Sequence, residues 1–259
     1  MDPATGGRVF VGTSGWRYAR WRGDYYPKGL PQRLELEHLS HRMNSVEING
    51  SFYSLQRPTS YERWRDATPR DFTFAVKGGR YLTHMVAPEQ TADGLQRFWD
   101  SGVLLLGAKL GPILWQLPER RGFEAERFEA FCAALPHTVQ HRRIRHAIEP
   151  RHPSFSAPEA RAILRRHRIA LVTSDGAGRW PLFDEPTAGF VYVRLHGPDE
   201  LYHGSYSGRP MRRWIDRVRR AATADGAGRT PRDAYVYFDN DADGRAPFDA
   251  EEFADSLTG

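Results

Sequence analysis

Residues 45–53 read SVEINGSFY, and their apolar and polar side chains alternate. Val46 and Ile48 share one parity, while Glu47 and Asn49 share the other. Because successive side chains of a β-strand point to opposite faces of the sheet, this alternation predicts a strand with one apolar and one polar face. The polar residues come late in the run, so the strand is expected to present them at its C-terminal end.

Seven further segments resemble this one, and amphipathic stretches of helical period separate them. The other strand candidates are residues 8–16, 72–78, 111–118, 145–151, 170–175, 189–197 and 234–241. The helical stretches include residues 34–43, 92–103, 124–135 and 157–167. Strands that are joined by helical crossovers pair in parallel.

This order of elements predicts a single closed (β/α)8 TIM-type barrel with eight parallel strands, spanning residues 1–259 as one domain. An open doubly wound sheet is the alternative. It is less favoured because neither GxGxxG nor GxxxxGK[ST] follows the first strand candidate.

Polar residues of one parity recur late in the strand candidates. In a barrel the apolar parity must face the surrounding helices, so the polar parity faces the axis, and barrel enzymes build their sites at the C-terminal ends of the strands. The predicted mouth therefore gathers Glu47, Asn49, Lys77, Gln116, Glu149, Arg151, Asp175, Arg194, His196 and Asp239.

These residue types suggest acid–base chemistry on an anion. Lys77, Arg151 and Arg194 are expected to bind a phosphate or carboxylate. Glu149 is predicted to act as general acid or base with His196 as its partner, and Glu47 is expected to orient substrate hydroxyls together with Asn49.

The alternative is a structural network, because four carboxylates would face three cations in near balance and buried charges must be paired in any case. Lys77 carries one further signal. Only three of the 37 basic residues are lysines, so an ammonium at this position is expected to be specifically required.

Aromatic and polar residues near the same end are predicted to bind substrate. Four aromatic side chains would stack on a sugar ring or a base: Trp16, Tyr53, Tyr202 and Tyr206. Tyr25 and Tyr26 are expected to pack the long first loop instead. Gln116, Asp239, Asn240 and His84 complete the predicted substrate-binding set.

Composition limits the remaining classes. The single cysteine, Cys132, excludes an internal disulfide, the polar start of the chain shows no secretion signal, and no apolar run could span a bilayer. A cytoplasmic protein without membrane contact is therefore expected, and the oligomeric state stays open. The net charge of +5 keeps nucleic acid as an alternative partner beside a small anionic ligand.

The chain also resembles the YecE-like family, called domain of unknown function 72. The matching segments are residues 12–27, 46–53, 72–84, 111–118, 148–155, 193–197, 202–206 and 237–246. The resemblance implies a TIM-type barrel distantly similar to sugar-isomerase and apurinic-endonuclease barrels, and it implies no established reaction. One departure concerns Asp239, since the family pattern usually begins with asparagine at that position.

Three chemistries compete for the mouth. A divalent-metal isomerase or phosphodiesterase would use Glu47, Glu149, His196 and Asp239 as ligands, but the nearby cations would repel the ion and no HxH or HExxH spacing occurs. A glycosidase would use paired Glu47 and Glu149. Metal-independent, hydrolase-like acid–base catalysis without a cofactor is the favoured hypothesis, and a non-catalytic barrel that binds nucleic acid or a phosphorylated metabolite is its alternative.

Overall fold

The computed structural model describes residues 6–85, 90–223 and 231–258, and its strands form two parallel sheets. One sheet has the order β1 (Val9–Thr13), β11 (Asp233–Phe238), β10 (Phe190–Leu195), β9 (Thr173–Asp175). The other has the order β2 (Ser45–Ile48), β3 (Thr73–Lys77), β4 (Leu110–Gln116), β7 (His146–Glu149), β8 (Ala170–Leu171). A small antiparallel hairpin, β5 (Thr138–Val139) and β6 (Arg142–Arg143), stands apart.

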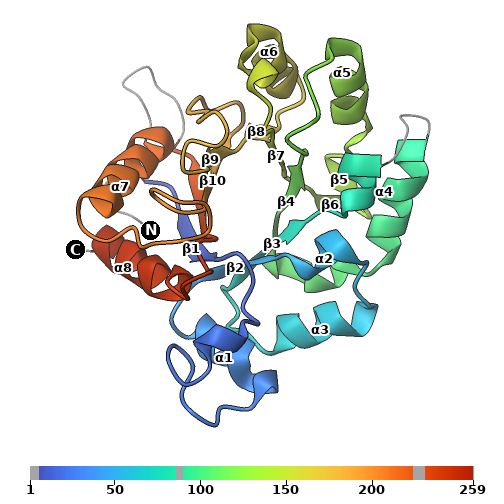
Figure 1. The fold of residues 1–259 in the computed structure, drawn as a ribbon. Coiled ribbons are helices and arrows are strands. Elements are labelled where there is room, and N and C mark those ends of the chain that lie inside the picture. The colour runs from blue at the N-terminus through green and yellow to red at the C-terminus, as the bar shows by residue number, and fades with distance from the viewer. Residues whose placement is uncertain (1–5, 86–89, 224–230, 259) are drawn as a thin grey trace.

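Helices surround the strands, which curve around a common centre (Figure 1). Along the chain they are α1 (Glu35–Ser40), α2 (Gly50–Tyr53), α3 (Pro58–Asp66), α4 (Thr91–Asp100), α5 (Ala125–Ala134), α6 (Pro158–Arg166), α7 (Arg209–Ala222) and α8 (Ala246–Thr258). In α7 the buried residues Met211, Trp214, Ile215 and Val218 recur at helical spacing, so one stripe of the helix faces the strands. No helix in the described part of the chain is long and apolar enough to cross a membrane.

The parallel α/β architecture is confirmed, but the described strands do not form the closed ladder of eight that the sequence predicts. At one seam the side-chain amide of Asn44 takes the place of strand pairing, because it accepts from Val11 N at 2.7 Å and donates to Val9 O at 2.9 Å. A single bridge, Ser14 to Glu47, joins β1 and β2 beyond it. At the other seam the strand is interrupted at Val172, between β8 and β9.

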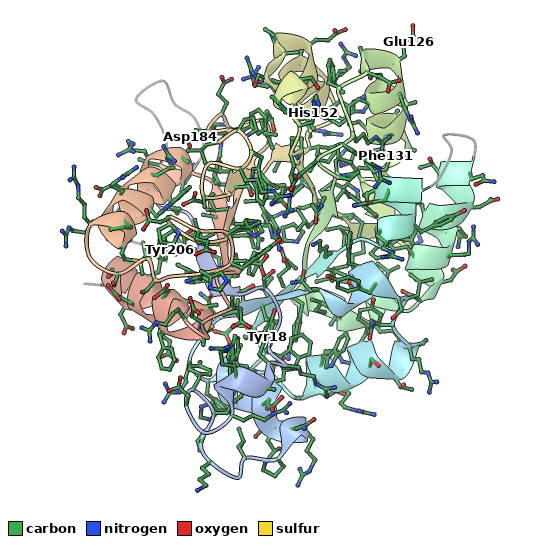
Figure 2. All side chains as sticks on the ribbon, in the orientation of Figure 1. Tyr18, Glu126, Phe131, His152, Asp184 and Tyr206 are labelled. Carbon is green, nitrogen blue, oxygen red and sulfur yellow. The ribbon has the colours of Figure 1, made fainter. Side chains whose placement is uncertain are left out.

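Two apolar clusters follow from the strand parity. The outer one joins residues such as Val46 and Val76 to the helices, and the inner one fills the centre with residues such as Tyr192 and Tyr235. Side chains crowd that centre in Figure 2, while Glu126 on α5 points outward. The predicted assignment of one parity to the helices and the other to the axis is therefore confirmed for these strands.

Candidate functional site

Arg194, on β10, lies at the centre of the polar layer above the inner cluster and is fully buried. Its Nε and Nη2 donate to Glu47 at 3.2 and 2.9 Å, and its Nη1 donates to Glu149 Oε2 at 2.9 Å. Nη2 also donates to Asp239 Oδ2 at 3.0 Å and to Ser14 Oγ at 2.8 Å. Burial alone would lower the pKa of Arg194, but the carboxylates outweigh it and raise that pKa well above its ordinary value.

Glu47 is fully buried and enclosed by donors on both carboxylate oxygens. Oε1 accepts from Ser14 Oγ at 2.5 Å, and Oε2 accepts from the Tyr192 hydroxyl at 2.5 Å, in addition to the bonds from Arg194. Asn49 Nδ2 in turn donates to Ser14 Oγ at 2.7 Å. These contacts fix the position of Glu47 and leave it little access to a substrate.

Glu149, at the end of β7, is equally enclosed. Ser174 Oγ donates to its Oε1 at 2.7 Å, and Arg151 Nη2 lies 3.4 Å from the same oxygen. Burial alone would raise the pKa of Glu149, but the charges of Arg194 and Arg151 and the hydrogen bond with His196 hold that pKa well below its usual range. A carboxylate that stays ionised in this way is a poor proton donor at neutral pH.

His196 connects the two sides of the network. Its Nε2 lies 3.1 Å from both Glu149 Oε1 and Arg194 Nη1, and its Nδ1 lies 2.9 Å from Asp239 Oδ2. Burial would raise the pKa of Asp239, yet Arg194 and His196 lower it to about 2. His196 and Asp239 thus brace Arg194 and Glu149, and the Asp239 side chain, 15% exposed, reaches the mouth.

Lys77, at the end of β3, differs from the rest of the layer. Within the described ranges its ammonium forms no hydrogen bond or ion pair, and its contact is with the ring of Phe52, 4.3 Å from Nζ to the centroid. Burial, followed by repulsion from Arg194, lowers the pKa of Lys77 to about 8, although Glu47, Glu149 and Asp239 oppose the shift. Lys77 therefore has a pKa close to neutral pH and, among the described residues, no hydrogen-bonding or charged partner.

Further cations lie on the same side of the mouth. Burial lowers the pKa of His84 to about 4, and the positive charges of Arg120, Lys77, Arg80 and Arg121 add to the shift. Arg151 stacks on Trp180, 4.0 Å from its guanidinium carbon to the ring centroid, and its Nε is buried with no hydrogen-bond partner in the described part of the chain. The mouth thus has a positive side near the ends of β3, β4 and β7.

Three predicted mouth or substrate residues take other positions. Asp175 faces α7, where it accepts from the Tyr206 hydroxyl at 3.1 Å and from Trp214 Nε1 at 3.2 Å, and Ser174 occupies the inward position. Tyr206 is fully buried, and its hydroxyl also accepts from Gly197 N at 2.8 Å (Figure 2). Asn240 donates to Asp249 Oδ2 at 2.7 Å and to Gly204 O at 2.9 Å. These contacts hold loops to the outer core.

Replacing Asn240 with alanine is therefore expected to lower the free energy of unfolding by about 1–3 kcal/mol, because Asp249 and Gly204 O lose a buried donor. The affinity for sulfate, which serves as a probe of the predicted anion site, should stay at the wild-type value. Urea denaturation and calorimetric titration of one preparation check both points. Loss of affinity with unchanged stability would return Asn240 to the substrate site.

The other predicted residues lie at varying distances from the centre. Gln116 is buried beside Glu149 in the ladder, and Tyr202 packs edge-on against His196 with ring centroids 5.6 Å apart. Tyr53 is 72% exposed and projects from α2. Trp16 is buried and lines a cavity of about 320 Å³ that Asn49 also lines.

Sequence reasoning missed several members of the site. Three of them share the inward parity of their strands, so the alternation of side chains along each strand could have identified them: Ser14, Tyr192 and Ser174. Trp64 and Gln56 come from α3 and the loop before it, and no strand pattern points to them.

The arrangement of the possible metal ligands also bears on whether the site could bind a metal ion. Throughout residues 6–85, 90–223 and 231–258, no three His, Cys, Asp or Glu side chains are grouped to hold one. The three carboxylates of the layer converge instead on the Arg194 guanidinium, which occupies the position that a cation would take.

Known proteins match this chain in sequence and in fold. The family described as "Protein of unknown function DUF72" matches residues 10–259. UPF0759 protein YecE of Escherichia coli K12 is 27% identical over 150 residues, which are 58% of this chain and 50% of that protein, so the match spans half the length of this relative. The crystal structure of a DUF72 family protein from Thermotoga maritima covers 97% of this chain and is itself covered over 100%, with TM-score 0.82 and 25% identity.

A more distant likeness concerns the fold alone. The crystal structure of an AP endonuclease, family 2, from Brucella melitensis has TM-score 0.52 and 14% identity, covering 96% of this chain and 98% of that one.

Proposed function

This chain belongs to the DUF72 family of proteins of unknown function, and from its own site we propose metal-independent acid–base chemistry on a small anionic substrate, with Lys77 binding the anion and transferring the proton. The observation that carries the proposal is the ammonium of Lys77, which ends a largely buried side chain and has no hydrogen-bond or ion-pair partner among the described residues. A buried cation is costly unless it is paired. An anion in the mouth would supply that pair.

The neighbouring charges support an anionic ligand rather than a cationic one. Arg151 lies at the edge of the layer, and Arg80, Arg120 and Arg121 surround His84 closely enough to lower its pKa. Arg194 is not available to a ligand, because all three of its nitrogens donate to protein acceptors. The proposed anion site therefore uses Lys77 and Arg151, without the third cation that the sequence predicts.

The proton-transfer role also moves to Lys77. A group transfers protons best when its pKa is near the working pH, and the pKa of Lys77 is about 8. Glu149 and Asp239 stay ionised, and Glu47 is sealed by four contacts. The protonated amine would deliver its proton to an oxygen of the substrate, and the neutral amine would take one back. Glu47, Glu149 and His196 keep Arg194 and Asp239 in position beneath it.

Two alternative functions would require different arrangements of these residues. A metal-dependent isomerase or phosphodiesterase, compatible with the endonuclease-like fold, would need the carboxylates to turn away from Arg194. A non-catalytic anion-binding barrel would use the same positive side and would need no proton from Lys77.

The pH dependence of sulfate binding tests the proposal, since the charge of sulfate is constant across the range. Affinity should be constant below pH 8 and fall about tenfold per unit above it, because the anion binds only the protonated amine. Lys77→Arg is the matched control: its guanidinium stays charged, so binding should persist and lose this pH dependence. Wild-type affinity that is level up to pH 10, or a fall that survives in Lys77→Arg, would remove Lys77 from the site.

A further inference from the structure

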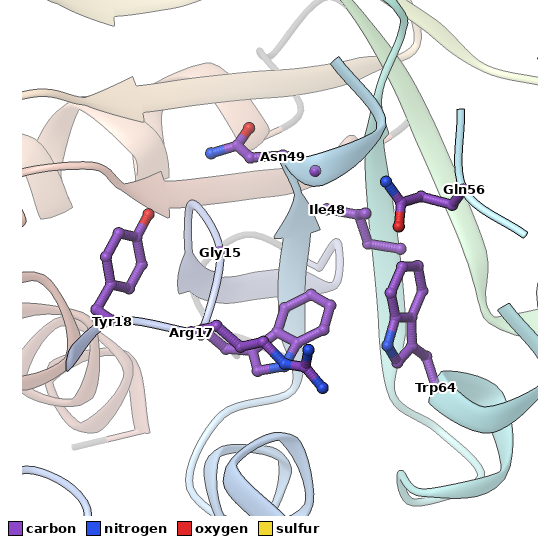
Figure 3. A pocket seen from close by; sticks show the side chains of 9 residues that line it. Gly15, Arg17, Tyr18, Ile48, Asn49, Gln56 and Trp64 are labelled. Atoms are coloured by element: carbon purple, nitrogen blue, oxygen red, sulfur yellow. The ribbon is translucent and has the colours of Figure 1, made fainter. Parts of the chain in front are cut away.

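A second recess opens next to the polar layer, between the loop that follows β1 and the helices α2 and α3. Its volume is about 320 Å³, and its lining includes Trp16 together with Tyr18, Ile48 and Trp64, which are labelled in Figure 3. Trp16 and Trp64 meet at nearly a right angle, with centroids 5.3 Å apart and planes inclined by 85°. A flat ring lying on one indole therefore presents its edge to the other.

Few polar groups reach this recess. Asn49 uses its Nδ2 on Ser14, and its Oδ1 is buried with no hydrogen-bond partner among the described atoms. Gln56 donates from Nε2 to Ser54 O at 3.0 Å and lines the opposite wall, and the exposed Arg17 lies at the rim. Gln56, whose amide oxygen points towards Trp64 in Figure 3, is therefore the side-chain amide that a ligand in the recess would meet.

This chemistry separates two kinds of ring. A hexose carries hydroxyls around its perimeter, and most of them would lose their hydrogen bonds against a wall formed mainly by indole and aliphatic groups. A nucleobase has two apolar faces and confines its donors and acceptors to one edge. The recess offers the same division, with aromatic surface on its walls and the side-chain amide of Gln56 for an edge.

The recess and the anion site share one short element. Gly50, at the start of α2, lines the recess, while Phe52 in the same helix contacts Lys77 Nζ. Ser51 Oγ in that helix donates to Lys77 O at 2.6 Å. Both positions therefore border the same short helix, α2.

We propose that the recess of Trp16 and Trp64 binds the nucleobase of a nucleotide-like substrate whose phosphate lies at Lys77. The inference rests on the proposed anion site and adds the substrate class to it. Trp64 and Gln56 are specificity-determining residues in this account, since they contact the base and not the anion.

The test compares ligands with and without a base on one protein. The four nucleoside 5′-monophosphates and ribose 5-phosphate are titrated calorimetrically against the full chain. At least one nucleotide should bind about tenfold or more tightly than ribose 5-phosphate, as expected when one base stacks on an indole. Trp64→Ala should remove that advantage and leave ribose 5-phosphate binding unchanged, whereas Lys77→Met should weaken both ligands.

Gln56→Ala provides a second variant that leaves the indoles in place, and it should change the preference among the four bases. Equal binding of nucleotides and ribose 5-phosphate, with both dependent on Lys77, would overturn the base site and leave the anion site standing. Binding of neither ligand would overturn both. A loss of ribose 5-phosphate affinity in a folded Trp64→Ala protein would also contradict the inference, because Trp64 would then act on the anion.

Discussion

Replacing Arg194 with methionine is expected to lower the free energy of unfolding by about 3–5 kcal/mol, the range found when one partner of a buried ion pair is removed. The side chain is fully buried and donates to Glu47, Glu149 and Asp239 at 2.9–3.0 Å. Methionine has a similar length and no charge, so the variant leaves three carboxylates facing one another. The loss in the free energy of unfolding is therefore expected to come mainly from the uncompensated charge of the carboxylates, and less from the smaller side-chain volume.

Urea denaturation at pH 7 measures this loss, and two variants control it. Arg194→Lys keeps the charge but cannot donate to three carboxylates in the same geometry, so an intermediate loss is expected. Arg143→Met removes an exposed arginine on β6 and should change stability by less than about 0.5 kcal/mol. A loss in Arg194→Met no larger than in Arg143→Met would mean that the network contributes nothing to folding.

The lowered pKa values of the carboxylates determine how the stabilisation by Arg194 changes with pH. The pKa of Asp239 is about 2 and that of Glu149 is well below its usual range, so their stabilisation is present above the unfolded pKa near 4. It is lost as the pH falls through the folded values. The difference between wild type and Arg194→Met should therefore narrow below pH 4.

Replacing Lys77 with methionine should lower sulfate affinity at pH 7 by roughly 30-fold or more, equivalent to about 2 kcal/mol for a desolvated charge contact. Any turnover that depends on the mouth should be lost as well. Stability should not fall, since the ammonium has no described partner and methionine relieves its burial.

Lys28→Met controls for net charge, because Lys28 is exposed in the first loop. That variant should bind sulfate like the wild type. If both lysine variants lose affinity equally, the effect is one of overall charge, and the anion site would have to lie elsewhere.

Strand alternation was enough to predict much of the site. It placed Glu47, Glu149, Arg194 and Asp239 on inward positions, because each lies on, or directly after, a strand whose other face is clearly apolar. It failed at Asp175, since residues 170–175 carry apolar side chains on both faces and the carboxylate alone suggested an inward position. Ala170 and Val172 belong to the inner cluster, so Ser174 shares their inward parity and Asp175 faces outward.

Other features depend on contacts that no pattern encodes. The closed ladder was predicted from the number of strands, but the side chain of Asn44 pairs with β1 where a neighbouring backbone was expected. Parity brought the charges to one layer without revealing which of them neutralise one another. The distances show which charges pair: Arg194 donates hydrogen bonds to carboxylates of the protein, whereas the described contact of Lys77 Nζ is with the Phe52 ring.

The amine of Lys77 is the group on which the proposed chemistry depends, and its protonation can be observed directly. Only Lys28, Lys77 and Lys109 are present, so ¹³Cε-lysine labelling gives three signals, which Lys28→Arg and Lys77→Arg assign. The Lys77 signal should titrate near pH 8, and saturating sulfate should move that midpoint upward because the anion binds the protonated form. A midpoint at the ordinary lysine value near 10.4, unchanged by sulfate, would contradict the account.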